Sequence, residues 1–598
     1  MVIKFGKWLT RHKAVVLIIA FLLLIPATIG YVSTRINYDL LSYLPNSLET
    51  VSGQDTMVDE FGMGAFSMIV VEDMEKKDIV ALKEKLKKVN HVEDVIWYDD
   101  AMDITVPTEM LPDKLREGLF NGNATMMIAL FDNTTSADST MDAITEMRGI
   151  VKKQAFISGM SGVVTDIKNL AMAEMPIYVV VAAVLSLLIL LLTMDSLVTP
   201  FIFLMGIGMA IVYNMGTNMV FGEISYITQA LTAILQLGVT MDYSIFLLES
   251  YEANKVRYDG DKNRAMAHAI SNTFTSVTSS SITTIAGFAA LCFMTFKLGM
   301  DLGLVMAKGV IIGVIVCLTV LPALILCFDK AIDKTTHKNL IPNLDGLSKK
   351  IVKGWPVVLV LFLVLLGPAM YGNSNYEIYY DIAGALPQSL DSAVANKKLE
   401  EKFNMNSTHI VLMKNGMASK EKSEMLKKIE DVKGVKWALG IDSFKGVSIP
   451  SSMIPKKLES KLKSDNYEIA FVCSDYKAAT DEVNSQIADI NKIVKKYSKD
   501  SMVIGEAPLT KDLQDVTDID LVNVNYVSVA AIFLIILITF KSILIPVILV
   551  MVIEFAIFLN MSVPFYTHES LPFVASIVIG TIQLCLLYTS DAADELAG

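Results

Sequence analysis

The chain has 598 residues, 53% of them hydrophobic, with a mean hydropathy of +0.49 and a formal net charge of −12. A protein of this length and apolar content is not expected to be water-soluble, because its apolar residues are gathered in long runs. The negative charge comes mostly from residues 31–174 and argues against a nucleic-acid partner. We therefore expect a membrane protein with an acidic, solvated segment.

Ten apolar stretches have the length and the low charge of membrane spans. They lie near residues 14–30, 176–193, 199–221, 227–248, 273–296, 303–327, 356–372, 522–540 and 542–562, and the tenth begins near residue 571. The first stretch is long and has no clear small-residue cleavage site, so we expect it to remain in the membrane as a span rather than to be removed as a signal peptide.

Basic residues predict the orientation of these spans. They gather before the first span, after the fourth, and between the sixth and the seventh, whereas the short loops near Glu223 and His568 carry neither Lys nor Arg. The basic residues are Lys4, Lys7, Arg11 and Lys13, then Lys255, Arg257, Lys262 and Arg264, then Lys330, Lys334, Lys338, Lys349, Lys350 and Lys353. All three basic segments fall on one side of the membrane, which predicts a multi-pass cell-membrane protein with a cytoplasmic N-terminus.

The chain contains an internal duplication. NYDLLSYLPNSL at 37–48 matches YYDIAGALPQSL at 379–390, and SLVTP at 196–200 matches SILIP at 542–546. PTEMLPDKL at 107–115 also matches PSSMIPKKL at 450–458. Each copy therefore consists of one span, a large external segment and a cluster of spans.

The two external segments have the same pattern of elements. Strand-like and helix-like stretches alternate as β-α-β-β-α-β in residues 31–174 and again in residues 373–520, which is typical of a split, ferredoxin-like domain. The predicted fold class is a polytopic α-helical membrane protein with two α+β, ferredoxin-like extracytoplasmic domains. The predicted division is 1–30 (first span), 31–174 (domain), 175–330 (spans two to six), 331–355 (cytoplasmic linker), 356–372 (seventh span), 373–520 (domain), 521–584 (spans eight and nine and the start of the tenth) and 585–598 (tail).

The second copy departs from the first near the C-terminus. The residues that align with Asp242 and Tyr243 are Thr589 and Ser590, and the apolar pattern changes in mid-helix to a polar, acidic sequence. We expect residues 585–598 to be a non-native tail that replaces most of the tenth span and two further spans. A divergent natural C-terminus is the alternative.

Asp242 is the strongest candidate for a functional residue, because it is an acid in the middle of the apolar run ITQALTAILQLGVTMDYSIFLL. An ionisable side chain at membrane depth costs several kcal/mol unless it is paired, hydrated or protonated. We predict a proton relay by Asp242 and Tyr243, with Gly238 allowing a neighbouring helix to approach closely. The alternative is a permanently protonated Asp242 that only holds helices together.

Polar residues of the next two spans are candidate supports for this relay. Ser280, Thr283 and Thr284 in TSVTSSSITT could face Asp242 or line a hydrated path, or could bond to their own helix. Lys308 is expected to extend toward the membrane interface, with a counter-ion role toward Asp242 as the alternative. Gly309 and Gly313 have the spacing of a helix-packing motif.

The remaining charged motifs favour structural roles. Glu249 and Glu252, followed by Lys255 and Arg257, are expected to begin a solvated interfacial helix. Asp39 and Asp381, in the repeated Tyr-Asp…Leu-Pro element, are expected to act as hinges between the membrane and the external domains. The sequence has no nucleotide-binding loop, catalytic motif, cofactor motif or metal-ligand spacing, so it predicts no catalytic residue, no cofactor and no metal.

The duplicated unit, together with GVTMDYSIFLL, TTIAGFAAL and LTVLPAL, resembles the RND superfamily and most closely its MmpL branch of hydrophobe exporters. The resemblance implies twelve spans, two external porter domains and Asp-Tyr pairs on spans four and ten that relay protons. Only Asp242-Tyr243 carries over. The family often has Arg eight residues after this Asp, where this chain has Ser250, so a cytoplasmic salt bridge of the family type is not expected.

The sequence thus predicts a secondary active transporter, not an enzyme, that exports lipids or other hydrophobic or amphiphilic molecules with the proton gradient. Its partners would be the cargo, protons and membrane lipids, and no coiled coil or docking segment indicates an oligomer. Two alternatives remain at this stage. One is a non-transporting receptor or scaffold of the sterol-sensing type on the same fold, and the other is a porter driven by sodium.

Overall fold

The computed structural model describes residues 2–100, 104, 108, 116, 118–151, 154–337, 345–441, 459 and 461–579. The chain forms two compact units. The helical unit comprises Met1–Asn37, Ala173–Tyr379 and Thr517–Gly598, and the α/β unit comprises Tyr38–Met172 and Tyr380–Val516. The division falls within two long helices, α7 (Met160–Thr193) and α19 (Glu506–Phe540).

Within the described residues, nine helical segments are long and apolar enough to cross a membrane, and they coincide with the first nine predicted spans. They are α2 (Lys13–Ser33), α7, α8 with the short helix η4 (Thr199–Phe221), α9 (Tyr226–Arg257), α10 with η5 (Lys262–Phe293), α11 (Lys297–Lys334), α13 (Trp355–Asn375), α19 and α20 (Leu544–Thr567). Of the tenth span, residues 573–579 are helical and the following residues lie outside the described part.

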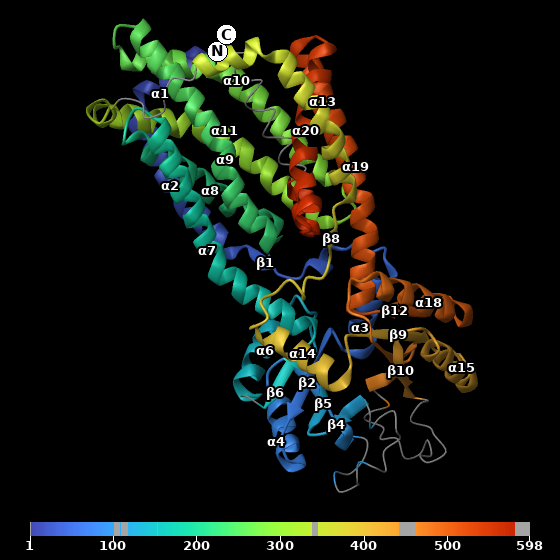
Figure 1. Cartoon of the computed structure of the whole chain (residues 1–598). Coiled ribbons are helices and arrows are strands. Elements are labelled where there is room, and N and C mark those ends of the chain that lie inside the picture. The colour runs from blue at the N-terminus through green and yellow to red at the C-terminus, as the bar shows by residue number, and fades with distance from the viewer. Residues whose placement is uncertain are drawn as a thin grey trace. The chain divides into compact units, whose positions relative to one another are not determined.

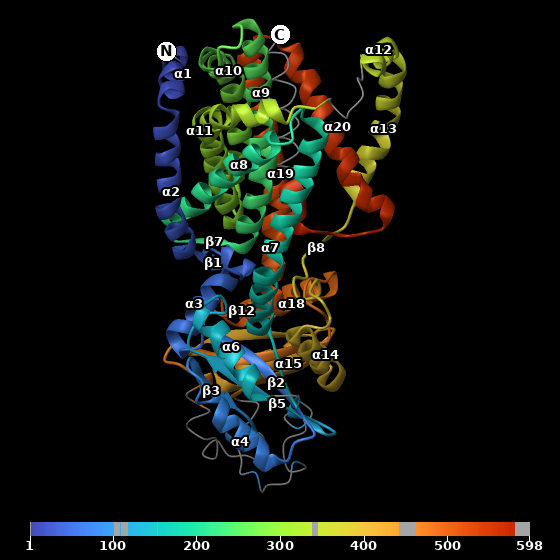
Figure 2. The same ribbon diagram turned by 90° about the vertical axis from the view of Figure 1, so that its left-hand side faces the viewer.

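Helices α9, α10 and α11 pack against one another and form the centre of the first span cluster (Figure 1). Helix α8 covers α9 and α11, α2 lies along α8 and α11, and the short helix α1 (Val2–Arg11) packs on α10. In the second copy, α13 packs along α20 (Figure 2). Helix α12 (Asp345–Lys353) precedes α13.

The two copies repeat the same helix crossing, which depends on glycine. A Cβ on Gly30 of α2 would collide with the carbonyl oxygen of Gly216 in α8. In the second copy, a Cβ on Gly372 of α13 would lie 2.6 Å from the Cβ of Ser562 in α20. Small residues let helix backbones approach where apolar lipid gives no hydrophobic driving force for association.

A two-stranded parallel ribbon also occurs in each copy. Strand β1 (Arg35–Asn37), after α2, pairs with β7 (Glu223–Ser225), just before α9. Strand β8 (Ile378–Tyr379), after α13, pairs with β13 (Leu571–Pro572). The duplication read from the sequence is therefore present in the backbone pairing.

In the α/β unit, the first sheet has the strand order β3-β5-β2-β6, with β4 paired to β5. All its pairs are antiparallel. The elements follow the predicted order with one added strand, the two-residue β4. They are β2 (Ala65–Glu72), α4 (Lys76–Leu86), β3 (Val92–Ile96), β4 (Phe120–Asn121), β5 (Ala124–Phe131), α6 (Asp138–Val151) and β6 (Ala155–Ser158).

The second sheet has the equivalent antiparallel order β10-β11-β9-β12. Its elements are β9 (Ser407–Lys414), α15 (Ser419–Glu430), β10 (Val435–Gly440), β11 (Tyr467–Ser474), α18 (Asp481–Tyr497) and β12 (Met502–Ile504). In each sheet the strand that comes first in the chain, β2 or β9, is central. The strand that follows the second helix, β6 or β12, lies next to it at the edge of the sheet.

Each half of the α/β unit carries a helix that packs on the other half. Helix α3 (Glu49–Phe61) precedes the first sheet in the chain but packs on β12 of the second sheet, and α14 (Asp391–Phe403) precedes the second sheet but packs on β6 of the first. Both helices are anchored alike. Thr50 Oγ1 of α3 donates to Asp512 of α19 (2.5 Å), and Ser392 N of α14 donates to Asp166 of α7 (2.8 Å).

This exchange explains why the central strands are apolar on both faces. On β2, Ile69 and Val71 face α4 and α6, while Met68 and Val70 pack with Leu399 and Phe403 of the exchanged helix α14. A strand buried on both sides reads as a continuous apolar run rather than as an alternating pattern.

Two predictions fall beyond the described part of the chain. The correspondence between 107–115 and 450–458 lies there apart from Thr108, and so does the predicted tail at 585–598 with Thr589 and Ser590.

Candidate functional site

Asp242 lies halfway along α9, roughly 20 Å from either end of the helix at about 1.5 Å per residue. The start of α9 is fixed by α11, because the Asp301 carboxylate accepts hydrogen bonds from Ser225 N and Thr228 Oγ1, both at 2.8 Å. The Asp242 side chain is partly buried, and no described residue forms a hydrogen bond or ion pair with it. The chain thus holds an acid in mid-helix without a protein partner in the described part.

Tyr243 joins α9 to both neighbouring helices. Its side chain is fully buried, its hydroxyl lies close to Ser280, Ser281 and Thr284 of α10, and its carbonyl oxygen accepts from Cys317 Sγ of α11 at 3.3 Å. None of the nearby hydroxyls reaches hydrogen-bond geometry with the Tyr243 hydroxyl. Polar groups buried in this way are normally satisfied by ordered water.

The supporting hydroxyls predicted on α10 divide into two kinds. Thr283 and Thr284 donate to the carbonyl oxygen of Ser280, at 2.6 and 3.2 Å, so they bond to their own helix. The hydroxyl of Ser280 is buried without a described partner, and so is that of Thr240, two residues before Asp242 on α9. Ser280 is therefore the predicted α10 residue whose hydroxyl is left available near Tyr243.

Gly238 does not make the close helix contact that its position suggested. A Cβ there would meet no neighbouring atom within 4 Å in the part of the chain that is described. The close approach to α9 occurs instead at Gly313 of α11, where a Cβ would lie 2.7 Å from Thr240 Oγ1, whereas a Cβ on Gly309 of α11 would first meet Asn214 of α8, at 2.5 Å. The sequence correctly indicated packing glycines on α11, but it could not indicate which face of α9 they meet.

Lys308 extends to the end of α8. Its Nζ donates to Asn214 O (2.9 Å), Thr217 Oγ1 (2.8 Å) and Asn218 Oδ1 (2.5 Å). A cation at the C-terminal end of a helix satisfies carbonyl groups that have no intrahelical donor. On α11, Lys308 also lies nine residues before Cys317, the neighbour of Tyr243, which is about 13 Å along the axis. This position favours the interfacial role over a counter-ion role toward Asp242.

A buried amide cluster that the sequence reasoning missed joins α8, α9 and α11. Asn214 Nδ2 donates to Gln236 Oε1 at 3.0 Å and to Val305 O at 3.3 Å, and Gln236 Nε2 donates to Gly309 O at 3.1 Å. The available signal was Gln236 itself, a polar residue within an apolar run.

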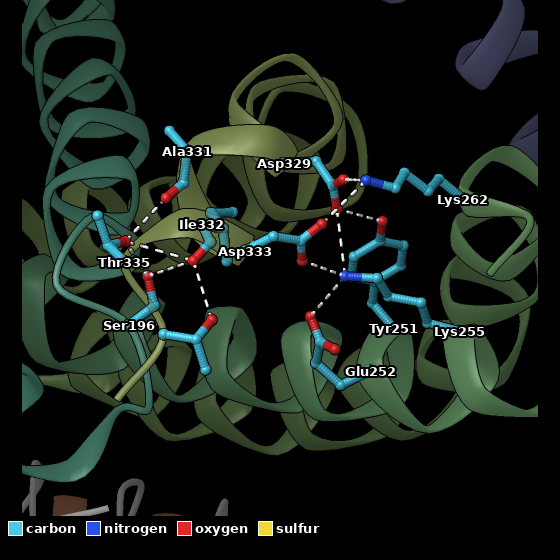
Figure 3. Close-up of polar contacts among 11 residues, drawn as sticks. Ser196, Tyr251, Glu252, Lys255, Lys262, Asp329, Ala331, Ile332, Asp333 and Thr335 are labelled. Carbon is cyan, nitrogen blue, oxygen red and sulfur yellow. Dashed lines mark hydrogen bonds and ion pairs between the residues drawn. The ribbon is translucent and has the colours of Figure 1, made fainter. Parts of the chain in front are cut away.

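An ion network where α9 and α11 end and α10 begins was also missed (Figure 3). The buried carboxylate of Asp329 accepts from Tyr251 Oη at 2.8 Å and pairs closely with Lys262 Nζ. Lys255 Nζ lies 2.7 Å from Asp333 and 3.6 Å from Asp329. Glu252 and Lys255 were expected on a solvated helix, yet Lys255 forms part of this network, so a salt bridge exists here although Ser250 replaces the Arg common in the family.

Glu554 is a second acid within an apolar helix. It lies in α20, its Oε1 is buried, and this atom has no hydrogen-bond partner in the described part of the chain. The sequence signal was the lone charge in the predicted span 542–562, the same signal that identified Asp242.

Comparison with known proteins identifies the family of this chain. The MMPL family model matches residues 66–360 and 384–581, so the chain belongs to the MMPL family, as its sequence resemblance indicated.

Two relatives illustrate the range of the family. The chain is 22% identical to the apo-petrobactin exporter of Bacillus anthracis over 76% of this chain and 65% of the exporter. It is 24% identical to the protein named "Probable transport protein MmpL12" of Mycobacterium tuberculosis over 46% of this chain and 25% of that protein. The chain therefore spans less than two thirds of the length of either relative.

Proposed function

We propose that this chain is a secondary active transporter that uses the proton gradient to export hydrophobic or amphiphilic molecules across the cytoplasmic membrane. The observation that carries the proposal is the unpaired carboxyl of Asp242, halfway along α9 and next to a fully buried tyrosine. The membership in the MMPL family and the names of the two relatives, one an exporter and one a transport protein, support it.

In this proposal Asp242 takes up a proton from outside and releases it inside. The buried hydroxyls of Tyr243, Ser280 and Thr240, which lack described partners, would order water into a path for that proton. Each charge that crosses gains about 2.3 kcal/mol per 100 mV of membrane potential. Neutralising and recharging one carboxyl would change how α9 packs against α10 and α11.

The two halves of the α/β unit would be the porter domains. We place residues 31–174 and 373–520 outside the membrane, as ferredoxin-like domains, and the N-terminus in the cytoplasm, on the strength of the basic segments that flank the spans. Cargo would pass between the two domains, and the long helices α7 and α19 would transmit the motion, because each continues from one unit into the other.

The test is proton-driven transport by the full-length protein in liposomes. With an imposed proton gradient, Asp242→Asn should reduce cargo transport and proton flux to the level of empty liposomes, while the protein remains monodisperse. Asp195→Asn, which changes an exposed acid of the helical unit outside its long helices, should transport as the unchanged protein does.

Three outcomes would contradict the proposal. Normal proton-driven transport by Asp242→Asn would show that Asp242 does not relay the proton. Transport that depends on a sodium gradient and not on pH would show that sodium, not the proton, is the coupling ion. An intact protein that binds a partner but moves no cargo under either gradient would indicate the receptor or scaffold alternative.

A further inference from the structure

The short helix α1 lies on the surface of the helical unit and packs on α10 (Figure 2). Its Leu9 side chain is fully buried, and a Cβ on Gly6 would lie 2.9 Å from the carbonyl oxygen of Ala267, so the two helix backbones are in close contact. Gly6 therefore determines which side of α1 meets α10. The other sides of α1 are exposed.

The exposed sides of α1 carry two rows of side chains. Phe5 and Trp8 form one row, in which the rings stack with centroids 6.4 Å apart and the residues are 39% and 51% exposed. Lys4, Lys7 and Arg11 form the other row, at the spacing of one helix face. A helix that combines aromatic side chains with a row of cations is typical of helices at a membrane interface.

Two further cations come close to this row from α9 and α10. Arg257 is the last residue of α9, and Arg264 lies in the first turn of α10. The positive charges of Lys7, Arg257 and Arg264 all act on His268 of α10. Three helices therefore bring one cation each to the same place, and we call Lys7, Arg257 and Arg264 the cationic patch.

The patch is built on stacked side chains. The guanidinium of Arg264 lies over the ring of Tyr258, 4.5 Å from its centroid, and the rings of Tyr258 and His268 lie with their centroids 4.6 Å apart. Stacking holds a guanidinium by its face and leaves the N–H groups at its edge free to donate. Arg264 is thereby oriented for paired hydrogen bonds to the oxygens of a phosphate.

The acids of the described chain do not neutralise the patch. Lys255 and Lys262, which are close to Arg257 and Arg264 in the sequence, pair with acids of α11. By contrast, Lys7, Arg257 and Arg264 are exposed and form no ion pair with a described residue. Clustered positive charge that the protein leaves uncompensated attracts anions to its surface.

The predicted spans place the patch near the depth of lipid head groups. Ala267, beneath α1, lies six residues before the predicted span 273–296, which is about 9 Å along the helix axis. The head-group layer covers roughly the first 5–8 Å outside the hydrocarbon core, and long basic side chains extend into it. Val256, beside Arg257, is 83% exposed, which costs less free energy against lipid than against water.

We propose that α1, the end of α9 and the start of α10 form a binding site for an anionic phospholipid of the adjacent membrane leaflet. The phosphate lies among Lys7, Arg257 and Arg264, while Phe5 and Trp8 lie at the border between the head groups and the acyl chains. The inference goes beyond the proposed function, because it assigns a resident lipid rather than a cargo. It requires a membrane around the helical unit, but neither proton coupling nor a direction of transport.

The test measures which lipid lies beside α1. The full chain is placed in phosphatidylcholine nanodiscs that contain a small fraction of phosphatidylglycerol, and bromine is carried on the acyl chains either of the phosphatidylglycerol or of the same fraction of phosphatidylcholine. Bromine quenches the fluorescence of a nearby indole, so the quenching that is lost in Trp8→Phe reports the lipid beside Trp8. We expect brominated phosphatidylglycerol to quench Trp8 at least twofold more strongly than brominated phosphatidylcholine.

Two triple variants distinguish a built site from a general attraction of anionic lipid. The first replaces all three cations of the patch by Gln, and in it the two lipids should quench Trp8 equally. The matched control is on α12, which also carries three exposed lysines without an ion pair to a described residue. It combines Lys349→Gln, Lys350→Gln and Lys353→Gln, removes the same charge, and should keep the preference for phosphatidylglycerol.

Four outcomes would overturn the assignment. Equal quenching by the two lipids in the unchanged protein would show that no preference exists. A preference that persists in the patch variant would place the lipid elsewhere. An equal loss in the α12 variant would mean that total charge attracts the lipid. A preference abolished by excess inorganic phosphate at constant ionic strength would mean that the patch takes free phosphate instead of a lipid.

The lipid comparison and the phosphate competition need no change of charge in the protein, so the inference can fail even if a charge variant does not fold. The test is also separate from the transport mechanism. Asp242→Asn should keep the preference for phosphatidylglycerol whether or not it still transports, since Asp242 lies in the middle of α9 and the patch lies at its end.

Discussion

The acids of the helical unit differ in how their charge is satisfied. Asp301 and Asp520 each accept backbone N–H groups, next to the start of α9 and α11 respectively, and Asp329 is paired with lysines. Asp242 and Glu554 lie within apolar helices and have no such partner in the described part. Asp301 and Asp520 therefore fix the ends of other helices, whereas the two unpaired acids fix no described helix end.

In the α/β unit, Asp39 makes stability depend on pH. The side chain is 8% exposed, and burial raises its pKa from 3.8 to about 6. Because the folded state binds the proton more tightly, this group favours folding below about pH 4, and that contribution is lost as the pH rises through 6. Asp39 lines a cavity of the α/β unit whose other titratable groups are Asp381, Lys397, Glu400, Lys477 and Glu506.

We predict that Asp39→Asn is more stable than the unchanged protein at pH 7, by up to about 3 kcal/mol at 1.36 kcal/mol per pKa unit. Below pH 4 the difference should vanish, since Asn can still accept the hydrogen bond from Leu41 N. Thermal unfolding measured at several pH values gives the result. A difference between the two proteins that is the same at pH 4 and pH 7 would contradict the assigned cause.

At the scale of elements, α9, α10 and α11 are held together in two ways. Near the middle, Gly309 and Gly313 let α11 approach α9, and at one end the ion network around Asp329 joins all three helices. Two acids of that network differ in exposure. The side chain of Asp329 is 4% exposed and that of Asp333 is 47% exposed.

Asp329→Asn is expected to destabilise the helical unit by about 1.5–3 kcal/mol, because the buried carboxylate loses its charge-assisted hydrogen bonds with Tyr251 and Lys262, while the lysine stays partly hydrated. Asp333→Asn, in the same network, should cost about 0–1 kcal/mol, as is usual for an exposed pair. Both values can be measured by unfolding in detergent. Equal losses for the two variants would mean that burial does not govern this network.

The sequence predicted the elements better than their contacts. Apolar runs located nine spans, and the repeat located two α/β halves with the same strand order, because length and periodicity are local properties. The open space beside Gly238 and the hydrogen bonds of Lys308 with the end of α8 depend on residues far away in the chain. The ion network was missed for the same reason, since Lys255 and Asp329 lie on helices that only packing brings together.

At the scale of the whole molecule, the exchange of α3 and α14 makes the two halves of the α/β unit interdependent. The faces of the sheets that these helices cover carry Met68, Val70 and Met126 in the first half, and Ile410 and Leu412 in the second. Neither half can bury these residues with its own helices, because those already cover the opposite face.

We predict that residues Tyr38–Met172, produced alone, do not form a monodisperse monomer. Mixing them with residues Tyr380–Val516 should give a one-to-one complex that unfolds in a single transition, as measured by light scattering and calorimetry. A single polypeptide that joins both segments by a linker is the control. A stable monomer of Tyr38–Met172 would show that the exchanged helix is dispensable.

The crossed helices also restrict how the two halves of the α/β unit can move relative to each other. If the halves simply moved apart, α3 would be pulled from β12 and α14 from β6, and the apolar surface beneath each helix would be wetted. A rotation of the two halves about α3 and α14 would leave α3 packed on β12 and α14 packed on β6. The apolar surfaces beneath α3 and α14 would then stay dry throughout the movement.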